Sequence, residues 1–579
     1  MRLAILGTLV WASVLMTACS ERSHHDIESR GYNGQGQDTS VSDTIGAVID
    51  VSGSNVRRRK DLEVVCKVWG FLKYYHPNIN NVVSAWDSYL IKLLRESATW
   101  QHTDQRDAAL LSLVNSLGEI DNGSKNSSQS DFLQPDLRWI DTSGLNPQLI
   151  SVLRKVQYAE RSECSRFVMR DNFTSAILFT NEMNYPNEVL SDAGYRLLTL
   201  FRLWNAVHYF FPYRTLTTIH WDSSLTTFIP RLAEDDNIRN FELSIYECIA
   251  RLDDSHAGVS GYSSLPHIMG ARRLAIDVEF FDTAAIVTNV YRSPDLENEA
   301  HVGDEIVSIH SEPVSRLVRH LRRFVPASHD GCLYRDIPTL MLRTDSAVGV
   351  VTVRRNGRLH SVRIPTSQHD VLGTAHGEYR RFVSAANQQN IGIINMEHFH
   401  TDSLRMYAQR LRSFSALVVD VRRTAGNHGL VELGEFFLPW PTKVALFSTP
   451  DCTTPGRFVN EREHSFGSRS GDHYRGKVIV IVGPKTQSHY EYKAMIIASS
   501  PTAILVGSQT AGTNGNITKL DLPGKATLTF TSLGVYYPDR GQTQRRGLRI
   551  DHIIERDRAT LLTGYDDVLD SAIKLAAIR

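Results

Sequence analysis

A serine stands where a predicted strand gives way to a predicted helix in the C-terminal part of the chain. Ser488 follows the apolar run KVIVIV at residues 477–482 and a short turn, and it precedes a helix-compatible stretch that ends near Ser499. A serine at such a turn lies beside backbone N–H groups that the helix does not use, and such donors can hold an oxyanion. Ser488 is therefore a candidate nucleophile. In the alternative interpretation, Thr486 or Ser488 simply caps the helix through its side-chain oxygen.

A nucleophilic serine needs a base, because its hydroxyl is a weak nucleophile until a neighbour removes the proton. The candidate base is His256, in the segment LDDSHAGV at residues 252–259. Histidine suits this role because its unperturbed pKa, roughly 6.5, lies near working pH. The alternative is that His256 is an ordinary solvated or core histidine. Lys493 lies closer to Ser488 in sequence, but one helical turn from His489 we expect it to be a solvated surface charge.

The motifs around these residues resemble those of the tail-specific (C-terminal processing) serine peptidases, family S41. The resemblance rests on TQSHYE at 486–491, on a second apolar strand at 503–506 followed by GSQTAGTNGN at 507–516, and on LGVYYPD at 533–539. In this family the serine of T-x-S-x-x-E is the nucleophile, which implies Ser488. The pair Ser255-His256 is similar to the base-bearing pair of the branch that includes the tricorn core protease. That branch implies His256 as the base and Ser255 as a polar support beside it.

The resemblance also implies a third group that orients the imidazole. The tricorn-like branch places a glutamate shortly before the segment that here reads GLRID at 547–551, and this position aligns with Gln544. Asp539 is the nearest carboxylate upstream. Glutamine can accept an N–H hydrogen bond but supplies no negative charge to an imidazolium. Other branches use a lysine beyond the serine, and because Thr513 stands at that place, we expect no Ser-Lys dyad on this loop.

An oxyanion hole requires N–H donors from the backbone. One is expected from the amide of His489, which follows the nucleophile, and one from the turn DVRRTAGN at 420–427, which contains Gly426. Glycine allows the backbone to face a ligand. The alternative is that this turn is a plain connection into a helix at 430–438.

The helical region upstream contains an internal repeat. Trp69, Tyr74, Pro77, Trp86, Asp87 and Leu90 recur 135 positions later as Trp204, Tyr209, Pro212, Trp221, Asp222 and Leu225. Both copies are predicted to be amphipathic helices with aromatic cores. Asp121 stands in the first copy where His256 stands in the second, so only the second copy carries the base.

A β-rich segment separates the helices from the core. Predicted strands at 274–281, 284–290, 349–354 and 359–364 include a hairpin around Asn356-Gly357, a strong turn signal. The run VGDEIVSI at 302–309 resembles the PDZ-like domains of the same peptidases. The resemblance implies a module that binds an extended peptide at a sheet edge, and a purely structural or gating role is the open alternative.

The N-terminus is predicted to be an export signal. Met1-Arg2 precedes an apolar stretch at 3–16, and Thr17-Ala18-Cys19 resembles the lipobox of bacterial lipoproteins, with Cys19 as the lipidated residue. The polar stretch that follows is expected to be a flexible tether. This pattern predicts a periplasmic or cell-surface enzyme held on a membrane by its lipid anchor.

Composition excludes some partners. The chain has 579 residues with 63 basic and 63 acidic side chains. This balance gives no reason to expect nucleic acid as a partner. Short basic clusters, such as Arg545-Arg546, are expected to be solvated. The five cysteines after Cys19 (Cys66, Cys164, Cys248, Cys332 and Cys452) lack zinc-ligand spacing, so no metal or other cofactor is expected. Cys66 and Cys248 are predicted to be buried thiols, and the disulfide pairing stays open.

Together these patterns predict a multidomain α/β protein. We expect a lipoprotein signal at 1–19, a linker at 20–57, a first helical repeat at 58–182, a second repeat with the Ser-His pair at 183–268, a PDZ-like domain at 269–368, and a ClpP/crotonase-like α/β peptidase core at 369–579. The predicted function is that of an exported serine peptidase acting on polypeptides. A catalytically impaired peptide- or ligand-binding protein on the same fold and an esterase with the same residues are the alternatives.

Overall fold

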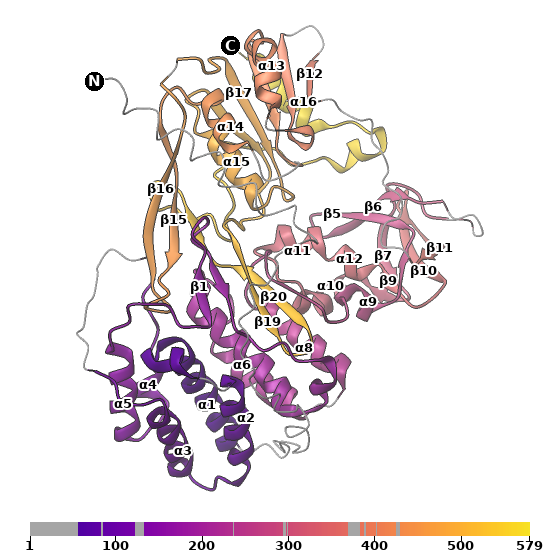
Figure 1. Ribbon diagram of the computed structural model, residues 1–579. Coiled ribbons are helices and arrows are strands. Elements are labelled where there is room, and N and C mark those ends of the chain that lie inside the picture. Colours follow the sequence, from indigo (N-terminus) through magenta and orange to yellow (C-terminus); the bar gives the residue numbers. More distant parts are fainter. Residues whose placement is uncertain are drawn as a thin grey trace, which may run out of the picture.

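The computed structural model describes residues 56–82, 85–121, 132–234, 237–292, 297, 299–368, 382–386, 390–400, 402–423, 429–469 and 471–578. The predicted signal, Cys19 and most of the predicted tether lie outside these residues, and so does Gly426. Three bodies are visible in Figure 1: a helical lobe, a β-rich unit beside it, and an α/β core above both. None of the helices in the described ranges is both long and apolar enough to cross a bilayer.

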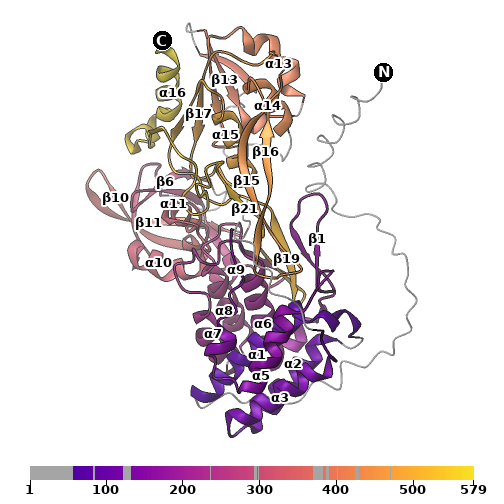
Figure 2. The same cartoon turned by 90° about the vertical axis from the view of Figure 1, so that its left-hand side faces the viewer.

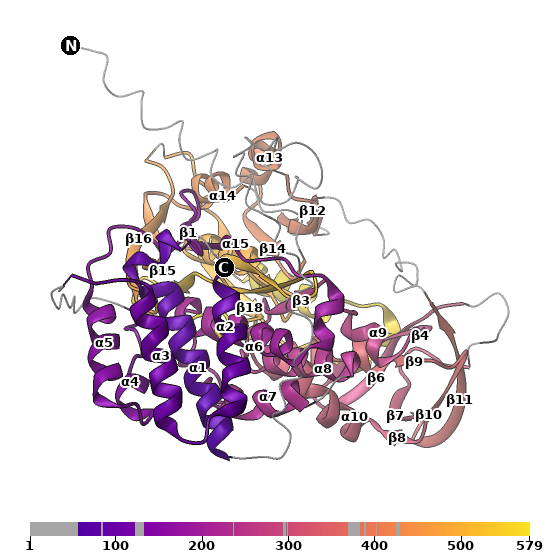
Figure 3. The same ribbon diagram turned by 60° about the horizontal axis from the view of Figure 1, so that its bottom comes forward.

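The helical lobe repeats its elements at the offset seen in the sequence. α1 (Val56–Tyr75), α2 (Trp86–Glu96) and α3 (Thr103–Ser116) are followed by α6 (Ala193–Phe210), α7 (Ser223–Glu234) and α8 (Ile238–Ala250). Between the two sets lie α4 (Trp139–Thr142), α5 (Pro147–Tyr158), β1 (Val168–Arg170) and β2 (Ile177–Phe179). α3 and α8 begin at residues 103 and 238, which are 135 positions apart. Figure 3 shows the helices of both sets grouped in one lobe.

Equivalent positions of the two copies face each other across the lobe. Lys67 pairs with Asp222 at 3.0 Å, and Arg202 pairs with Asp87, so two residues related by the offset contact two others that are also related by it. Gly70 and its equivalent Asn205 meet where α1 crosses α6, and a Cβ on Gly70 would lie 2.0 Å from the Asn205 side chain. Such reciprocal contacts are the signature of a two-fold related interface.

α6 departs from the predicted amphipathic pattern, because every one of its residues is buried. A helix that is buried on all faces needs partners for its polar groups. Arg202 obtains them from Asp87, Glu182 and the carbonyl oxygens of Met183 and Asp521. The second repeat therefore provides the central helix of the lobe.

The β-rich unit is an eight-stranded sheet in the order β5-β6-β7-β10-β11-β4-β9, with β8 paired to β7. Its strands are β4 (Arg272–Leu274), β5 (Ile276–Phe281), β6 (Ala284–Val290), β7 (Glu305–Ile309), β8 (Glu312–Pro313), β9 (Arg343–Thr344), β10 (Val348–Arg355) and β11 (Arg358–Ser367), and its helices are α10 (Val314–Leu321), α11 (Asp330–Asp336) and α12 (Pro338–Met341). The predicted turn joins β10 to β11, with Asn356 and Gly357 at φ 48° and 77°. Both values are those of a type I′ turn.

The core is a six-stranded sheet in the order β12-β13-β14-β17-β18-β22, parallel except for β12. Its strands are β12 (Val383–Ala386), β13 (Ile391–Asn395), β14 (Ala416–Asp420), β17 (Lys477–Val482), β18 (Ala503–Gly507) and β22 (His552–Ile553), and its helices are α13 (Ser403–Arg412), α14 (Leu430–Phe437), α15 (His489–Ala498) and α16 (Asp567–Ala577). β17 is buried along nearly its whole length, as its apolar run predicts.

Two hairpins of the core reach the helical lobe (Figures 1 and 2). β15 (Thr442–Pro450) and β16 (Phe458–Phe466) form one, with β21 (Gly534–Tyr536) on its other edge. β19 (Ile517–Leu522) and β20 (Ala526–Thr531) form the other, and β20 also pairs with β3 (Gly258–Ser260). α9 (Leu265–Met269) follows β3. The segment that carries His256 is thereby attached to a strand of the core.

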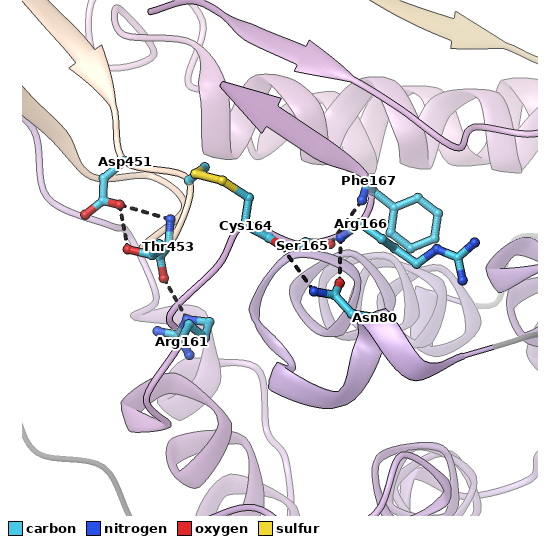
Figure 4. The surroundings of a disulfide bond; sticks show 9 residues. Asn80, Arg161, Cys164, Ser165, Arg166, Phe167, Asp451 and Thr453 are labelled. Atoms are coloured by element: carbon cyan, nitrogen blue, oxygen red, sulfur yellow. Dashed lines mark hydrogen bonds between the residues drawn. A yellow bond between two sulfur atoms is a disulfide. The ribbon is translucent and has the colours of Figure 1, made fainter. Parts of the chain in front are cut away.

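A disulfide joins the first hairpin to the helical lobe. Cys164 is bonded to Cys452, in the loop between β15 and β16 (Figure 4). Nearby, Arg161 Nε donates to the carbonyl oxygen of Thr453 at 2.6 Å. The pairing that the sequence left open is thus decided by the fold. Cys66, Cys248 and Cys332 are buried free thiols, which confirms the prediction for the first two.

Removal of the disulfide by Cys164→Ser and Cys452→Ser should lower the free energy of unfolding by up to about 5 kcal/mol, because the bond closes a loop of 288 residues in the unfolded chain. Thermal unfolding with and without reductant measures this effect. Reductant should bring the wild type down to the double variant and leave the double variant unchanged. A wild type that is insensitive to reductant would contradict the structural role of the bond.

Candidate active site

Ser488 occupies a strained position between β17 and α15. Its backbone has φ 59° and ψ −126°, a conformation that non-glycine residues rarely adopt. Its side chain is half-buried and does not cap the helix, and it has no hydrogen-bond partner among the described residues. Thr486 instead fastens the turn, because its Oγ1 donates to the carbonyl oxygen of Val421 and accepts from the amide of Gly483. The capping alternative for Ser488 is therefore not realised.

His256 lies in the loop between α8 and β3 and is half-buried. Its Nδ1 lies 2.9 Å from Thr531 Oγ1, at the end of β20, and Thr531 Oγ1 donates to Asp254 Oδ1 at 3.1 Å. The hydroxyl has one hydrogen and the carboxylate only accepts, so Thr531 must accept from His256 Nδ1–H. This arrangement selects the tautomer whose Nε2 carries the lone pair.

The protonation state of His256 follows from its surroundings. Burial lowers its pKa, and the negative charge of Asp254 opposes that effect. A lowered pKa keeps the imidazole neutral near pH 7. The ring can then accept a proton on Nε2, as a general base must.

Two hydrogen-bonded paths join the segment of the candidate base to the segment of the candidate nucleophile. Gln487 Nε2 donates to the carbonyl oxygen of Ser255 at 3.3 Å. On the second path, Ser328 Oγ bonds both Ser255 Oγ, at 3.0 Å, and Thr513 Oγ1, and the Thr513 carbonyl oxygen accepts from the Ser488 amide at 2.8 Å. Residues 255 and 487, the immediate neighbours of the candidate base and the candidate nucleophile, are thus in direct contact.

Ser328 brings the β-rich unit into this junction. Its amide donates to Ser255 Oγ at 3.1 Å, and its Oγ accepts from the Ser255 amide at 3.0 Å. Its carbonyl oxygen accepts from Arg545 Nε at 3.1 Å. Arg545 also pairs with Asp253 at 3.3 Å, so it contacts all three bodies. The expectation that Arg545 is a solvated charge was wrong.

Three predicted supports of the base have other contacts. Ser255 Oγ bonds Ser328 and not the imidazole, whose Nδ1 is bonded to Thr531. Asp539 is exposed and pairs with Arg549 at 2.8 Å, so it lies outside the site. Gln544 does reach the network, where its Nε2 donates a long hydrogen bond of 3.5 Å to Asp254 Oδ1.

Glu491 holds the loop that follows β18. Thr510 Oγ1 and the amides of Gly512 and Thr513 donate to its carboxylate at 2.5, 2.9 and 3.0 Å. Burial nevertheless raises its pKa to about 7. Because the Thr513 carbonyl oxygen accepts from the Ser488 amide, Glu491 positions the candidate nucleophile through this loop.

Of the two expected oxyanion donors, the structure describes His489 but not Gly426. His489 is the first residue of α15, where backbone amides point out of the helix. Gly426 lies in a stretch that the structure does not describe, although the strand end before it is anchored: Arg422 pairs with both Asp420 and Asp566 at 2.7 Å.

Lys493 does not have the solvated position expected for it. It is buried in α15, with Nζ 5.0 Å from the ring centre of Phe399. Burial lowers its pKa to about 8. The described ranges contain no cluster of three or more His, Cys, Asp or Glu side chains that could hold a metal ion.

Sequence reasoning missed the residues that complete this site. Thr531 and Asp254 bond His256, and Ser328 bonds the neighbouring Ser255. No sequence pattern around these three residues predicts the contacts. Asp254 was visible only as one of two adjacent aspartates in the Ser-His motif.

A family model matches part of the chain. Residues 390–554 match the model of Peptidase family S41. This match covers most of the core and includes Ser488. No curated protein sequence matches the chain.

Solved structures share the fold at low sequence identity. A crystal structure of a CPAF mutant has a TM-score of 0.53 and 13% identity, covering 66% of this chain and 97% of that chain. Mature CPAF complexed with lactacystin has a TM-score of 0.50 and 13% identity, covering 66% and 98%. The photosystem II D1 C-terminal processing protease has a TM-score of 0.38 and 14% identity, covering 66% and 97%. Over the 66% of the chain that they cover, the CPAF structures show that this multidomain α/β fold resembles known structures.

The titration of Glu491 should make the free energy of unfolding depend on pH. The pKa of Glu491 in the folded protein, about 7, exceeds the ordinary value of 4.5. The protonated carboxyl therefore contributes its full share to the free energy of unfolding below pH 4.5, and this share is lost as the pH rises through about 7. Glu491→Gln should remove about 3 kcal/mol of pH dependence between these values. Urea unfolding at pH 4.5 and 7.5 measures it.

Glu435→Gln is the matched control, because Glu435 is an exposed residue of neighbouring α14. It should keep the wild-type pH dependence. An unchanged dependence in Glu491→Gln would show that this carboxyl does not titrate in the folded state.

Proposed function

We propose that this protein is an exported serine peptidase that hydrolyses peptide bonds through an acyl-enzyme, with Ser488 as nucleophile and His256 as general base. One observation carries the proposal: residues 255 and 487 are hydrogen-bonded to each other, although 232 positions separate them in the chain. The match of the core to Peptidase family S41 supports the reaction class.

In the proposed reaction, His256 Nε2 takes the proton of Ser488 Oγ as that oxygen attacks the peptide carbonyl carbon. The tetrahedral intermediate collapses when the C–N bond breaks, and the leaving amine takes the proton from His256. A water molecule then attacks the ester, again giving its proton to Nε2. The acid product leaves, and Ser488 regains its hydrogen.

The oxyanion of each intermediate needs donors that are already in place. The His489 amide is the first proposed donor, because it follows the nucleophile at the start of α15. The second is proposed in the turn after β14, around Gly426. The pairing of Arg422 with Asp566 supports this assignment, since it fixes the chain where the turn begins.

The β-rich unit is proposed to be PDZ-like and the core to be of the ClpP/crotonase type. The VGDEIVSI motif supports the first assignment, because Gly303, at φ 92°, turns the chain into β7. The unit also supplies Ser328 to the active-site junction. A peptide bound at an edge of its sheet would therefore lie on a unit that contacts the catalytic segment.

A binding protein without activity is the rival proposal. It gives no reason for an imidazole held in one tautomer or for a serine in a strained backbone conformation. Strain of this kind persists where function or packing requires it. An esterase would use the same residues, so substrate assays must separate it from a peptidase.

The proposed site of action is the periplasm or cell surface, on a lipid anchor at Cys19. The Cys164–Cys452 disulfide supports export, because disulfides persist in oxidising compartments. The lipobox-like sequence at residues 17–19 supports the anchor.

Labelling by a fluorophosphonate tests the nucleophile and the base. Wild type should be labelled on Ser488, Ser488→Ala should not be labelled, and His256→Ala should react about 10²- to 10⁴-fold more slowly, since it lacks the general base. Ser499→Ala, at the far end of α15, should react like wild type. Peptide mapping identifies the site.

An unlabelled wild type would favour the binding protein, and labelling that survives Ser488→Ala would exclude this nucleophile. Turnover of a fluorescent casein alongside a simple ester then separates peptidase from esterase activity.

Metabolic labelling with radioactive palmitate in a bacterial host tests the anchor. Wild type should incorporate the label and partition with membranes, and Cys19→Ser should do neither, because the lipid is attached to this thiol. Incorporation into Cys19→Ser would contradict the proposed lipidation site.

A further inference from the structure

We propose that Asp254, acting through Thr531, is the acidic residue that orients and stabilises His256. Position 544 then carries an uncharged glutamine because a second carboxylate there would lie beside that of Asp254. This inference rests on the proposed function. The family resemblance implies a carboxylate at position 544, where this chain has an amide. In this protein the carboxylate that Gln544 contacts is Asp254.

The surroundings of Asp254 suit an ionised carboxylate. The side chain is fully buried, and each group that hydrogen-bonds to it within the described residues is a donor. Oδ1 accepts from the His256 amide and Thr531 Oγ1, both at 3.1 Å, and Oδ2 accepts from the Thr531 amide at 2.9 Å. A buried charge is tolerated when hydrogen bonds satisfy it in this way. Asp254 therefore supplies the charge that the imidazolium requires.

Thr531 transmits the effect of Asp254 to the ring. Its hydroxyl donates to Asp254 and accepts from His256 Nδ1, so one side chain fixes the ring's tautomer and its orientation. Its amide bond to Asp254 ties the same pair through the backbone. Thr531 and Asp254 are thus positioning residues, since both act on the reaction through the base.

Gln544 has the orientation that a neighbouring carboxylate imposes. Its Nε2 points to Asp254 Oδ1, and its buried Oε1 has no hydrogen-bond partner in the described part of the chain. The reversed amide would place oxygen against oxygen. A glutamate at this position would set two carboxylates side by side, and such a pair holds a proton because both cannot ionise freely.

Other charged or titratable groups near His256 have their own partners. Arg545 pairs with Asp253, and Glu491 accepts from residues 510–513. His329, from the β-rich unit, bonds the Thr510 carbonyl oxygen. Asp254 is the acidic side chain that bonds Thr531, so its removal should change the titration of the base.

The test measures the second-order rate of fluorophosphonate labelling of the full chain as a function of pH. Asp254→Asn should lower the plateau rate by about 10²- to 10⁴-fold, the range seen when a catalytic histidine loses its acidic partner. The same variant should also move the midpoint of the pH–rate profile to lower pH. The negative charge of Asp254 raises the pKa of His256, and this charge is absent from the variant.

Thr531 provides variants that keep Asp254. Thr531→Val should lower the rate by roughly 10- to 100-fold, since the hydroxyl that selects the tautomer is lost, whereas Thr531→Ser should restore it to within about 3-fold. Thr527→Val is the matched control on the same strand; its hydroxyl bonds exposed Asp521. It should react like wild type.

The decisive variant relocates the charge. Asp254→Asn combined with Gln544→Glu returns a carboxylate to the network, and it should react at least about 10-fold faster than Asp254→Asn alone. Thermal unfolding of each variant shows whether it is folded. If folded Asp254→Asn and Thr531→Val have the labelling rate and the pH-profile midpoint of wild type, this inference is overturned. The proposed roles of Ser488 and His256 would be unaffected by that result. Failure of wild type to label would instead overturn the proposed function.

Discussion

The pairing of β20 with β3 is the contact on which the candidate site depends. The candidate base, His256, belongs to the helical lobe and the candidate nucleophile, Ser488, to the core, so neither body alone contains the candidate site. Antiparallel pairing of β20 with β3, with Thr529 opposite Gly258, places the end of β20 beside the loop of His256. Thr531, two residues further along β20, then bonds both the imidazole and Asp254. A backbone ladder resists shear between the two bodies, which a few side-chain contacts would not.

The polar groups at the junction of the three bodies are costly unless they are satisfied. Ser328 and Thr513 are fully buried, and their hydroxyls bond each other, with Ser255 completing the chain. A buried polar group without a partner destabilises a fold by about 1–3 kcal/mol, so any movement of one body breaks several such bonds at once. The same bonds that stabilise the junction therefore hold the base segment against the nucleophile segment. Arg545 adds an ion pair across it.

The second connection between lobe and core lies away from the site. The loop after β15 is held by the disulfide, and Tyr75 OH and Arg214 donate to the carbonyl oxygens of Pro455 and Gly456. With two separate attachments, the β20–β3 pairing and the loop after β15, the core cannot rotate about either one relative to the helical lobe. The duplicated helices provide the platform for this second attachment, because Tyr75 is the last residue of α1 and Arg214 lies in the loop after α6. The first repeat thus has a structural use although it lacks a base.

The sequence alone determined the elements whose pattern is local. KVIVIV predicted β17 to the residue, because a buried parallel strand needs an uninterrupted apolar run, and Asn356-Gly357 predicted its hairpin, because few residues accept positive φ. Only the tertiary structure decided which of Asp253 and Asp254 faces the base, that Lys493 is buried, and that Thr531 bonds a histidine 275 positions away. Burial and hydrogen-bond partners depend on which distant segments meet, and no local pattern records that.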